Sequence, residues 1–137
     1  MIKGLEFHHF GLAVKDPHKA ISFLALIGYE IGDSVYDPKQ KAILQLCVSD
    51  KMPAVELVYA KKTDNSPLKS ILKTNDELCY HYCYSTENIE NTVQILKQHS
   101  LKAICISKPK PAILFNNRNV AFYYIRGFGI IELLEIK

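Results

Sequence analysis

The spacing of apolar and polar residues in the first part of the chain predicts, in order, a strand, a helix and three more strands. Residues 6–14, EFHHFGLAV, form a strand-like run. Asp16 is a candidate helix N-cap, Pro17 suits the first helical position, and Gly28 is expected to end the helix. The apolar stripe of this helix is expected to comprise Ala20, Ile21, Phe23, Leu24 and Ile27. The strand-like runs YEIGDSVYD, KAILQLCV and AVELVYA follow.

The same order of elements then returns. A polar link, KKTDNSP, leads to a short helix, LKSILK, and ELCYHYCYS resembles the opening strand. Thr86 is expected to cap a second helix, whose apolar stripe is Ile89, Val93, Ile95 and Leu96. The runs LKAICIS, VAFYYI and IIELLEI complete the series. We therefore expect a single α+β domain over residues 1–137, built from a βαβββ module at 5–60, a linker with a short helix at 61–76, and a second βαβββ module at 77–137.

The two modules match in detail when one is shifted by 72 positions, which sets His9 over His81. Each module also ends its strand series with a glutamate. Glu56 comes 47 residues after His9, and Glu132 comes 51 residues after His81. Each module thus opens on a strand histidine and closes on a strand glutamate, a coincidence that an ordinary apolar core does not explain.

In the run GFGIIELLEIK, Glu132 places an ionisable carboxylate in the middle of an apolar strand. An ionised carboxylate in such a place costs several kcal/mol or more unless a cation meets it. If pseudo-twofold symmetry forms one open, barrel-like cleft from the two modules, His9, Glu56, His81 and Glu132 meet at its centre. Two imidazoles and two carboxylates suit Zn, Co, Ni, Mn or Fe(II).

The competing interpretation is that these four residues are ordinary. A lone strand histidine is usually a hydrogen-bonded core or surface residue, and a lone strand glutamate usually faces water. Their matched positions favour the metal site. His8 points to the opposite face from His9 and is expected to be structural, while Glu6 and Glu135 are expected to face solvent.

Composition narrows the function classes. The chain has 137 residues, of which 48% are hydrophobic and 23% charged, which is typical of a soluble globular domain. Its net charge of +3 is mild, and no basic face alternates with aromatics as in nucleic-acid-binding proteins. No apolar run approaches the roughly 20 residues that span a bilayer, and the N-terminus lacks the apolar core of a secretory signal. We expect a cytoplasmic protein with a small-molecule ligand, no nucleic acid and no membrane partner.

Two further groups of residues allow more than one interpretation. The segment SKPKPAILFNNR contains the basic residues Lys108, Lys110 and Arg118, and it is either an anion-binding stretch or a solvated loop. The cysteines form no CxxC pair, so they indicate neither a zinc ribbon nor a thioredoxin motif, and they are expected to be buried thiols: Cys47, Cys79, Cys83 and Cys105. A soft-metal cluster of Cys79, His81 and Cys83 is the alternative, although alternate side chains on a strand stand about 6–7 Å apart.

The chain resembles the vicinal oxygen chelate superfamily, which includes glyoxalase I, methylmalonyl-CoA epimerase, extradiol dioxygenases and bleomycin-resistance proteins. FHHFGLAVKDPHKAISFLALIGYEI is similar to the opening motif of that family, with Leu24 in place of a helix tyrosine. VELV, YHYCYST and GIIELLE resemble the other three ligand strands. The resemblance places the metal ligands of the epimerase and glyoxalase branches on His9, Glu56, His81 and Glu132.

The resemblance implies a divalent-metal-dependent enzyme that removes a proton next to a carbonyl group, as an epimerase of a short acyl thioester does. Glu132 would then serve as ligand and base, and Asp37 as a second base. Lys108, Lys110 and Arg118 would hold phosphates of a coenzyme A arm. A lactoylglutathione lyase and a non-enzymatic drug-binding protein remain alternatives, and family members often form homodimers.

Overall fold

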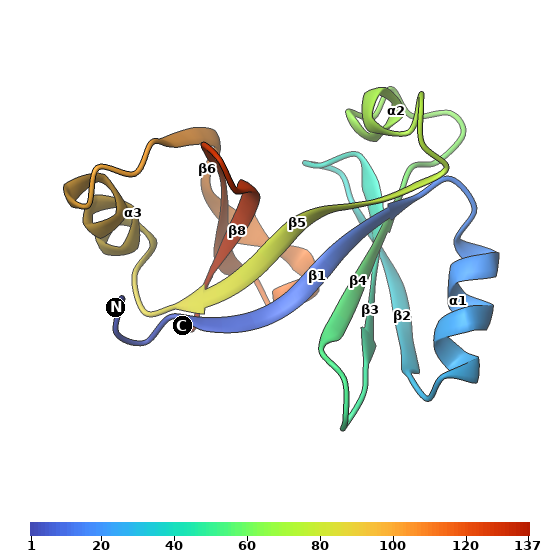
Figure 1. The fold of residues 1–137 in the computed structure, drawn as a ribbon. Coiled ribbons are helices and arrows are strands. Elements are labelled where there is room, and N and C mark those ends of the chain that lie inside the picture. Colours follow the sequence, from blue (N-terminus) through green and yellow to red (C-terminus); the bar gives the residue numbers. More distant parts are fainter. The chain divides into compact units, whose positions relative to one another are not determined.

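A computed structural model describes all 137 residues, and the chain divides into two compact units, one of residues 9–80 and one of residues 1–8 together with 81–137. The chain forms eight strands and few helices, as in an α+β fold; Figure 1 shows their arrangement along the chain. The first βαβββ series comprises β1 (Glu6–Val14), α1 (Pro17–Leu26), β2 (Glu30–Asp37), β3 (Ala42–Val48) and β4 (Ala54–Tyr59). After the short helix α2 (Leu68–Ile71), the second series comprises β5 (Glu77–Thr86), α3 (Ile89–Gln98), β6 (Ala103–Ala112), β7 (Arg118–Ile125) and β8 (Gly129–Glu135), with a 3₁₀ turn at Ile113–Phe115.

The two series have the same strand topology. β1 pairs in parallel with β4, while β3 pairs antiparallel with both β2 and β4. β5 likewise pairs in parallel with β8, while β7 pairs antiparallel with both β6 and β8. The predicted α+β class and its two βαβββ modules are confirmed.

The two long helices match the 72-residue repeat at both ends: α3 begins and ends 72 positions after α1. Asp16 and Asn88 are the N-caps at equivalent positions, and the side chain of each accepts a backbone hydrogen bond from the first turn. Thr86 was expected to be the second cap, and that prediction is wrong. Its Oγ1 is instead 2.7 Å from Oγ1 of Thr92, because β5 continues through Thr86 before the chain turns.

Both helices end in the left-handed conformation. Gly28 has φ 103° and Ser100, its equivalent, has φ 60°. The following amide donates back to the last turn in each case, from Tyr29 to the Leu24 carbonyl and from Leu101 to the Leu96 carbonyl. The predicted stop at Gly28 is therefore confirmed, whereas Ser100 shows that the second stop needs no glycine.

Each helix covers its own apolar cluster. Leu24 of α1 packs with Val14, Cys47 and Leu57, and Ile89 and Val93 of α3 pack with residues of β7 and β8. Phe23 was expected in the apolar stripe, but 61% of its surface is exposed, because α1 turns only a narrow face to the sheet.

None of the helices combines the length and the apolar sequence that a membrane-spanning helix requires.

Candidate functional site

Strand register places one histidine and one glutamate on the same face in each module. Glu56 of β4 lies opposite Gly11 of β1, two positions after His9. Glu132 of β8 lies opposite Cys83 of β5, two positions after His81. Since side chains two apart on a strand share a face, each glutamate is one diagonal step from its histidine.

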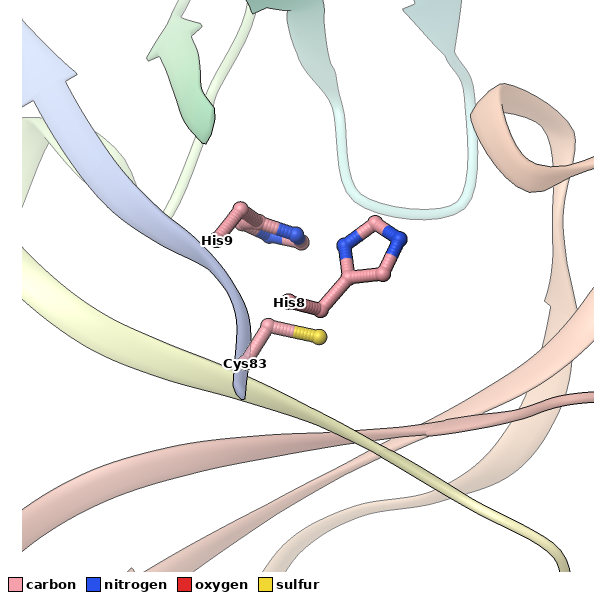
Figure 2. A group of neighbouring side chains, drawn as sticks. All are labelled: His8, His9 and Cys83. Carbon is pink, nitrogen blue, oxygen red and sulfur yellow. The ribbon is translucent and has the colours of Figure 1, made fainter. Parts of the chain in front are cut away.

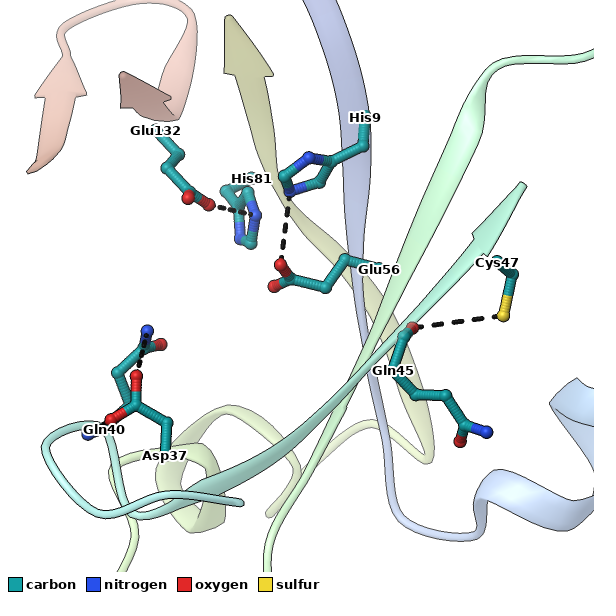
Figure 3. A network of polar contacts seen from close by, with 8 residues as sticks. All are labelled: His9, Asp37, Gln40, Gln45, Cys47, Glu56, His81 and Glu132. Carbon is teal, nitrogen blue, oxygen red and sulfur yellow. Dashed lines mark hydrogen bonds and ion pairs between the residues drawn. The ribbon is translucent and has the colours of Figure 1, made fainter. Parts of the chain in front are cut away.

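The pair in the first module is buried. His9 is fully buried and Glu56 is 3% exposed. Nε2 of His9 is 3.5 Å from Oε2 of Glu56, as Figure 3 shows. This distance is that of a close ionic contact, longer than a well-formed hydrogen bond.

The pair in the second module is closer. Nε2 of His81 is 2.9 Å from Oε2 of Glu132, the distance of a close ion pair. His81 is fully buried and Glu132 is 2% exposed, so Glu132 does not face solvent. Phe122 of β7 contacts the His81 ring edge-on, with centroids 5.3 Å apart, and restricts the orientation of the imidazole.

The donor atoms of each pair fit a divalent transition metal. Imidazole nitrogen and carboxylate oxygen are both common ligands of Zn, Mn, Fe(II), Co and Ni. A carboxylate with almost no exposed surface needs a proton, a protonated imidazole or a metal ion to offset the loss of hydration. Each module therefore contributes one buried nitrogen donor and one buried carboxylate.

His8 also belongs to a group of side chains that could hold a metal ion. It is half-buried, and its ring meets Phe115 edge-on with centroids 5.5 Å apart. Figure 2 shows His8 with the thiol of Cys83, and the donor atoms of the two residues lie within 4.8 Å of each other. The contact with Phe115 fits the structural role expected for His8.

Asp37, the predicted second base, is 3% exposed at the end of β2 and has a clear local role. Its Oδ1 accepts hydrogen bonds from the backbone amides of Lys39 and Gln40, at 2.9 and 3.4 Å. Its Oδ2 accepts from Nε2 of Gln40 at 3.1 Å (Figure 3). Both oxygens thus stabilise the turn between β2 and β3.

The expectation of a solvated loop is only partly right: residues 113–117 connect two strands and Lys108 is exposed, but the basic residues themselves lie in strands. Lys108 and Lys110 lie in β6, Arg118 begins β7, and Lys110 pairs with Val120 across the two strands. β6 tolerates its two prolines because it is an edge strand, and a register shift in its ladder with β7 also covers Pro109. Nε of Arg118 donates to the Phe115 carbonyl at 3.2 Å, which satisfies part of its guanidinium.

Two other expectations need correction. Cys47 and Cys83 are buried as expected, but Cys79 and Cys105 are exposed. Glu135 was expected to face solvent, yet its carboxylate accepts hydrogen bonds from the Ile89 amide and the Asn119 side chain. The amide of Ile89 is an otherwise unsatisfied donor of the first turn of α3, which explains the position of the carboxylate.

Sequence reasoning overlooked a buried polar residue on β3, on the opposite face of the sheet from Glu56. Gln45 of β3 is 8% exposed, its Nε2 donates to the Gly32 carbonyl at 2.8 Å, and its Oε1 accepts from the Tyr59 hydroxyl at 3.2 Å. The signal was available, because Gln45 interrupts the apolar run AILQLCV as Glu132 interrupts IIELLEI. Its hydrogen bonds give it a structural role.

Comparison with known proteins decides the family. Residues 8–122 match the family model described as the glyoxalase/bleomycin resistance protein/dioxygenase superfamily. The chain belongs to this superfamily. No curated protein sequence matches the chain.

Solved structures of the superfamily share the fold over nearly the whole chain. Methylmalonyl-CoA epimerase from Mycobacterium tuberculosis has a TM-score of 0.78 at 16% identity and covers 98% of this chain and 91% of its own. A hypothetical protein from Bacillus halodurans has a TM-score of 0.81 at 19% identity, covering 98% and 96%. A Streptomyces coelicolor methylmalonyl-CoA epimerase variant in complex with 2-nitronate-propionyl-CoA has a TM-score of 0.69 at 14% identity, covering 95% and 96%. At such identities the likeness establishes the vicinal oxygen chelate fold.

Proposed function

We propose that the protein is a divalent-metal-dependent enzyme that removes a proton next to a carbonyl group, as an epimerase of a short acyl thioester does. One observation carries the proposal. Two buried histidine–glutamate pairs, His9 with Glu56 and His81 with Glu132, occupy the same register in two equivalent modules. Isolated buried pairs contribute little to stability, so a fold gains little by keeping two of them for structure alone.

The ligands of the ion would be His9, Glu56, His81 and Glu132. When bound, a divalent ion supplies electrostatic stabilisation of the negative charge that develops on a carbonyl oxygen as the neighbouring carbon loses its proton. The identity of the metal, among Co, Ni, Zn, Mn and Fe(II), is left to measurement.

In this proposal Glu132 takes the proton from carbon. Its burial keeps water from competing for the carboxylate, and the contact with His81 fixes its orientation. Epimerisation also needs a second acid–base group that returns a proton to the opposite face of the carbon. We assign this role to Asp37, which would have to be protonated before Glu132 takes the substrate proton. Because both Asp37 oxygens accept hydrogen bonds, the turn at Lys39 and Gln40 would have to release one of them.

The acyl thioester class is supported by the structural neighbours, one of which contains 2-nitronate-propionyl-CoA and another methylmalonyl-CoA. We propose that Lys108, Lys110 and Arg118 contact phosphates of such a substrate, and that the protein acts in the cytoplasm as a homodimer. The lactoylglutathione lyase and the bleomycin-resistance type of binding protein rest on superfamily membership alone.

The direct test follows exchange of the α-proton. Methylmalonyl-CoA is incubated in deuterated water with metal-loaded protein, with stripped protein and with Glu132→Gln, and proton loss is followed by NMR. We expect exchange only with the loaded wild type. Glu6→Gln, which changes an exposed carboxylate on β1, is the matched control and should exchange at the wild-type rate. Exchange that is absent from the loaded wild type, or unaffected by Glu132→Gln, contradicts the proposal.

A further inference from the structure

A small cavity within residues 9–80 is lined by four lysines. Its volume is about 210 Å³, and its apolar wall is formed by Val14, Ala60 and Leu72. The cationic residues come from three separate segments: Lys15 follows β1, Lys61 and Lys62 follow β4, and Lys69 lies in α2. No carboxylate is among the residues that line it.

The turn that carries two of these lysines is fixed to β2. Nζ of Lys61 lies 3.7 Å from the centre of the Tyr36 ring, a cation–π contact. The Tyr36 hydroxyl donates to Oδ2 of Asp64 at 2.8 Å, and the Asp64 amide donates to the Lys61 carbonyl at 3.1 Å. Both ends of the turn therefore contact Tyr36, and the Asp64 carboxylate, which accepts a hydrogen bond from that tyrosine, is not among the residues that line the cavity.

A third lysine of the cavity, Lys15, is held by Asp76. Nζ of Lys15 is 3.0 Å from Oδ1 of Asp76, and the Lys15 amide donates to the Asp76 carbonyl at 3.0 Å. The Asp76 side chain is 80% exposed, so water screens this pair and its contribution is small. Lys62 and Lys69 have no ion-pair partner. The cavity therefore keeps an excess of positive charge.

Like charges held close together repel one another, and a multiply charged anion between them removes that cost. We propose that this cavity binds phosphate groups of a small phosphorylated molecule. The lysines supply point charges and N–H donors for phosphate oxygens, and the apolar wall reduces competition from water. The phosphates belong either to the carrier arm of the substrate or to a separate phosphorylated ligand. The site uses none of the proposed metal ligands and does not depend on the proposed activity.

Binding is measured by calorimetry with inorganic pyrophosphate and the full chain, in the presence of a chelator so that no metal contributes. We expect saturable binding that weakens with added salt, because salt screens the lysines. Lys61→Gln combined with Lys69→Gln should lower the affinity on the order of tenfold. The matched control, Lys97→Gln with Lys102→Gln, removes two exposed lysines from the other unit and should bind as the wild type does.

Absence of pyrophosphate binding in the wild type, or equal losses in the two double variants, would overturn the proposal. Circular dichroism of both variants checks that each is folded. Since all four substitutions change surface lysines, neither variant is expected to unfold the chain.

A second set of measurements identifies the source of the phosphates. If the substrate arm supplies them, Lys61→Gln with Lys69→Gln raises KM for a coenzyme A thioester and leaves KM for the phosphate-free pantetheine thioester unchanged. If a separate ligand supplies them, pyrophosphate binding weakens and both KM values stay the same. Failure of all turnover would count against the proposed enzyme function and leave the pyrophosphate titration valid.

Discussion

The two buried histidine–glutamate pairs occupy equivalent positions, yet their atoms meet at different distances. His81 and Glu132 are 2.9 Å apart, whereas His9 and Glu56 are 3.5 Å apart. The second histidine is also held edge-on by Phe122. The repeat thus gives each module the same chemical groups, while their surroundings make the second pair the more firmly positioned one. We infer that the second pair carries the catalytic base and that the first chiefly holds the ion.

The largest effect separates the two glutamates. Glu132→Gln should lower the turnover rate by about 10³-fold, because an amide cannot accept the substrate proton. Glu56→Gln should lower it only about tenfold, because the amide oxygen can still coordinate a metal. Turnover at saturating metal measures both. Equal losses in the two variants would break the proposed division of roles.

Metal removal should show how much a single ion, bound by both modules, adds to the stability of the folded chain. At a metal concentration of about 100 times Kd, binding to the folded state adds about 2.7 kcal/mol to the free energy of unfolding. For a chain of this size that corresponds to a rise in Tm of roughly 5–15 °C. His9→Ala and His81→Ala should each remove the rise. Thermal unfolding with and without a chelator gives the answer, and a rise that persists in either variant argues against a shared ion.

A smaller effect concerns the two helix ends. Ser100→Gly should raise the free energy of unfolding by up to about 1 kcal/mol, because glycine adopts φ 60° without the side-chain clash of serine. Gly28→Ser should lower it by about 1 kcal/mol, through backbone strain alone, since an added Cβ at Gly28 meets no atom within 4 Å. Urea unfolding measures both variants. If both changes have the same sign, the equivalence of the two helix ends is wrong.

The smallest effect concerns how fast a thiol reagent modifies the cysteines of the two modules. The only cysteine of the first series, Cys47, is buried, and burial raises the pKa of its thiol above the ordinary value. Cys79 and Cys105, from the second series, are exposed, and Cys83 is buried. A thiol reagent at neutral pH should therefore modify two cysteines quickly and the other two only after unfolding. Mass spectrometry of peptides identifies the sites, and rapid labelling of Cys47 would contradict this packing.

Much of the fold follows from the sequence because its signals are local. The N-cap at Asp16, the stop at Gly28 and the alternating strand runs each depend on a few neighbouring residues, and the structure confirms them. The errors arose where distant residues decide. Thr86 stays in a strand because β5 pairs with β8, and Lys108 lies in a strand because β6 is an edge strand, where prolines are tolerated.

The candidate site was predictable for a different reason. Internal repetition compares the chain with itself, so a histidine and a glutamate that recur at matched positions stand out without any alignment. Register then confirms that each glutamate shares a face with its histidine. The hydrogen bonds that occupy Asp37 were not predictable, because they come from the geometry of one turn.

The central claim is that both pairs hold one divalent ion together. Calorimetric titration of stripped, untagged protein with Co(II), Ni(II), Mn(II) and Zn(II) tests it most directly, with Glu56→Gln and Glu132→Gln as one variant from each module. The account predicts one ion per chain for at least one of these metals, bound more weakly in both variants. No binding by the wild type, or binding that only one of the two variants weakens, would contradict it.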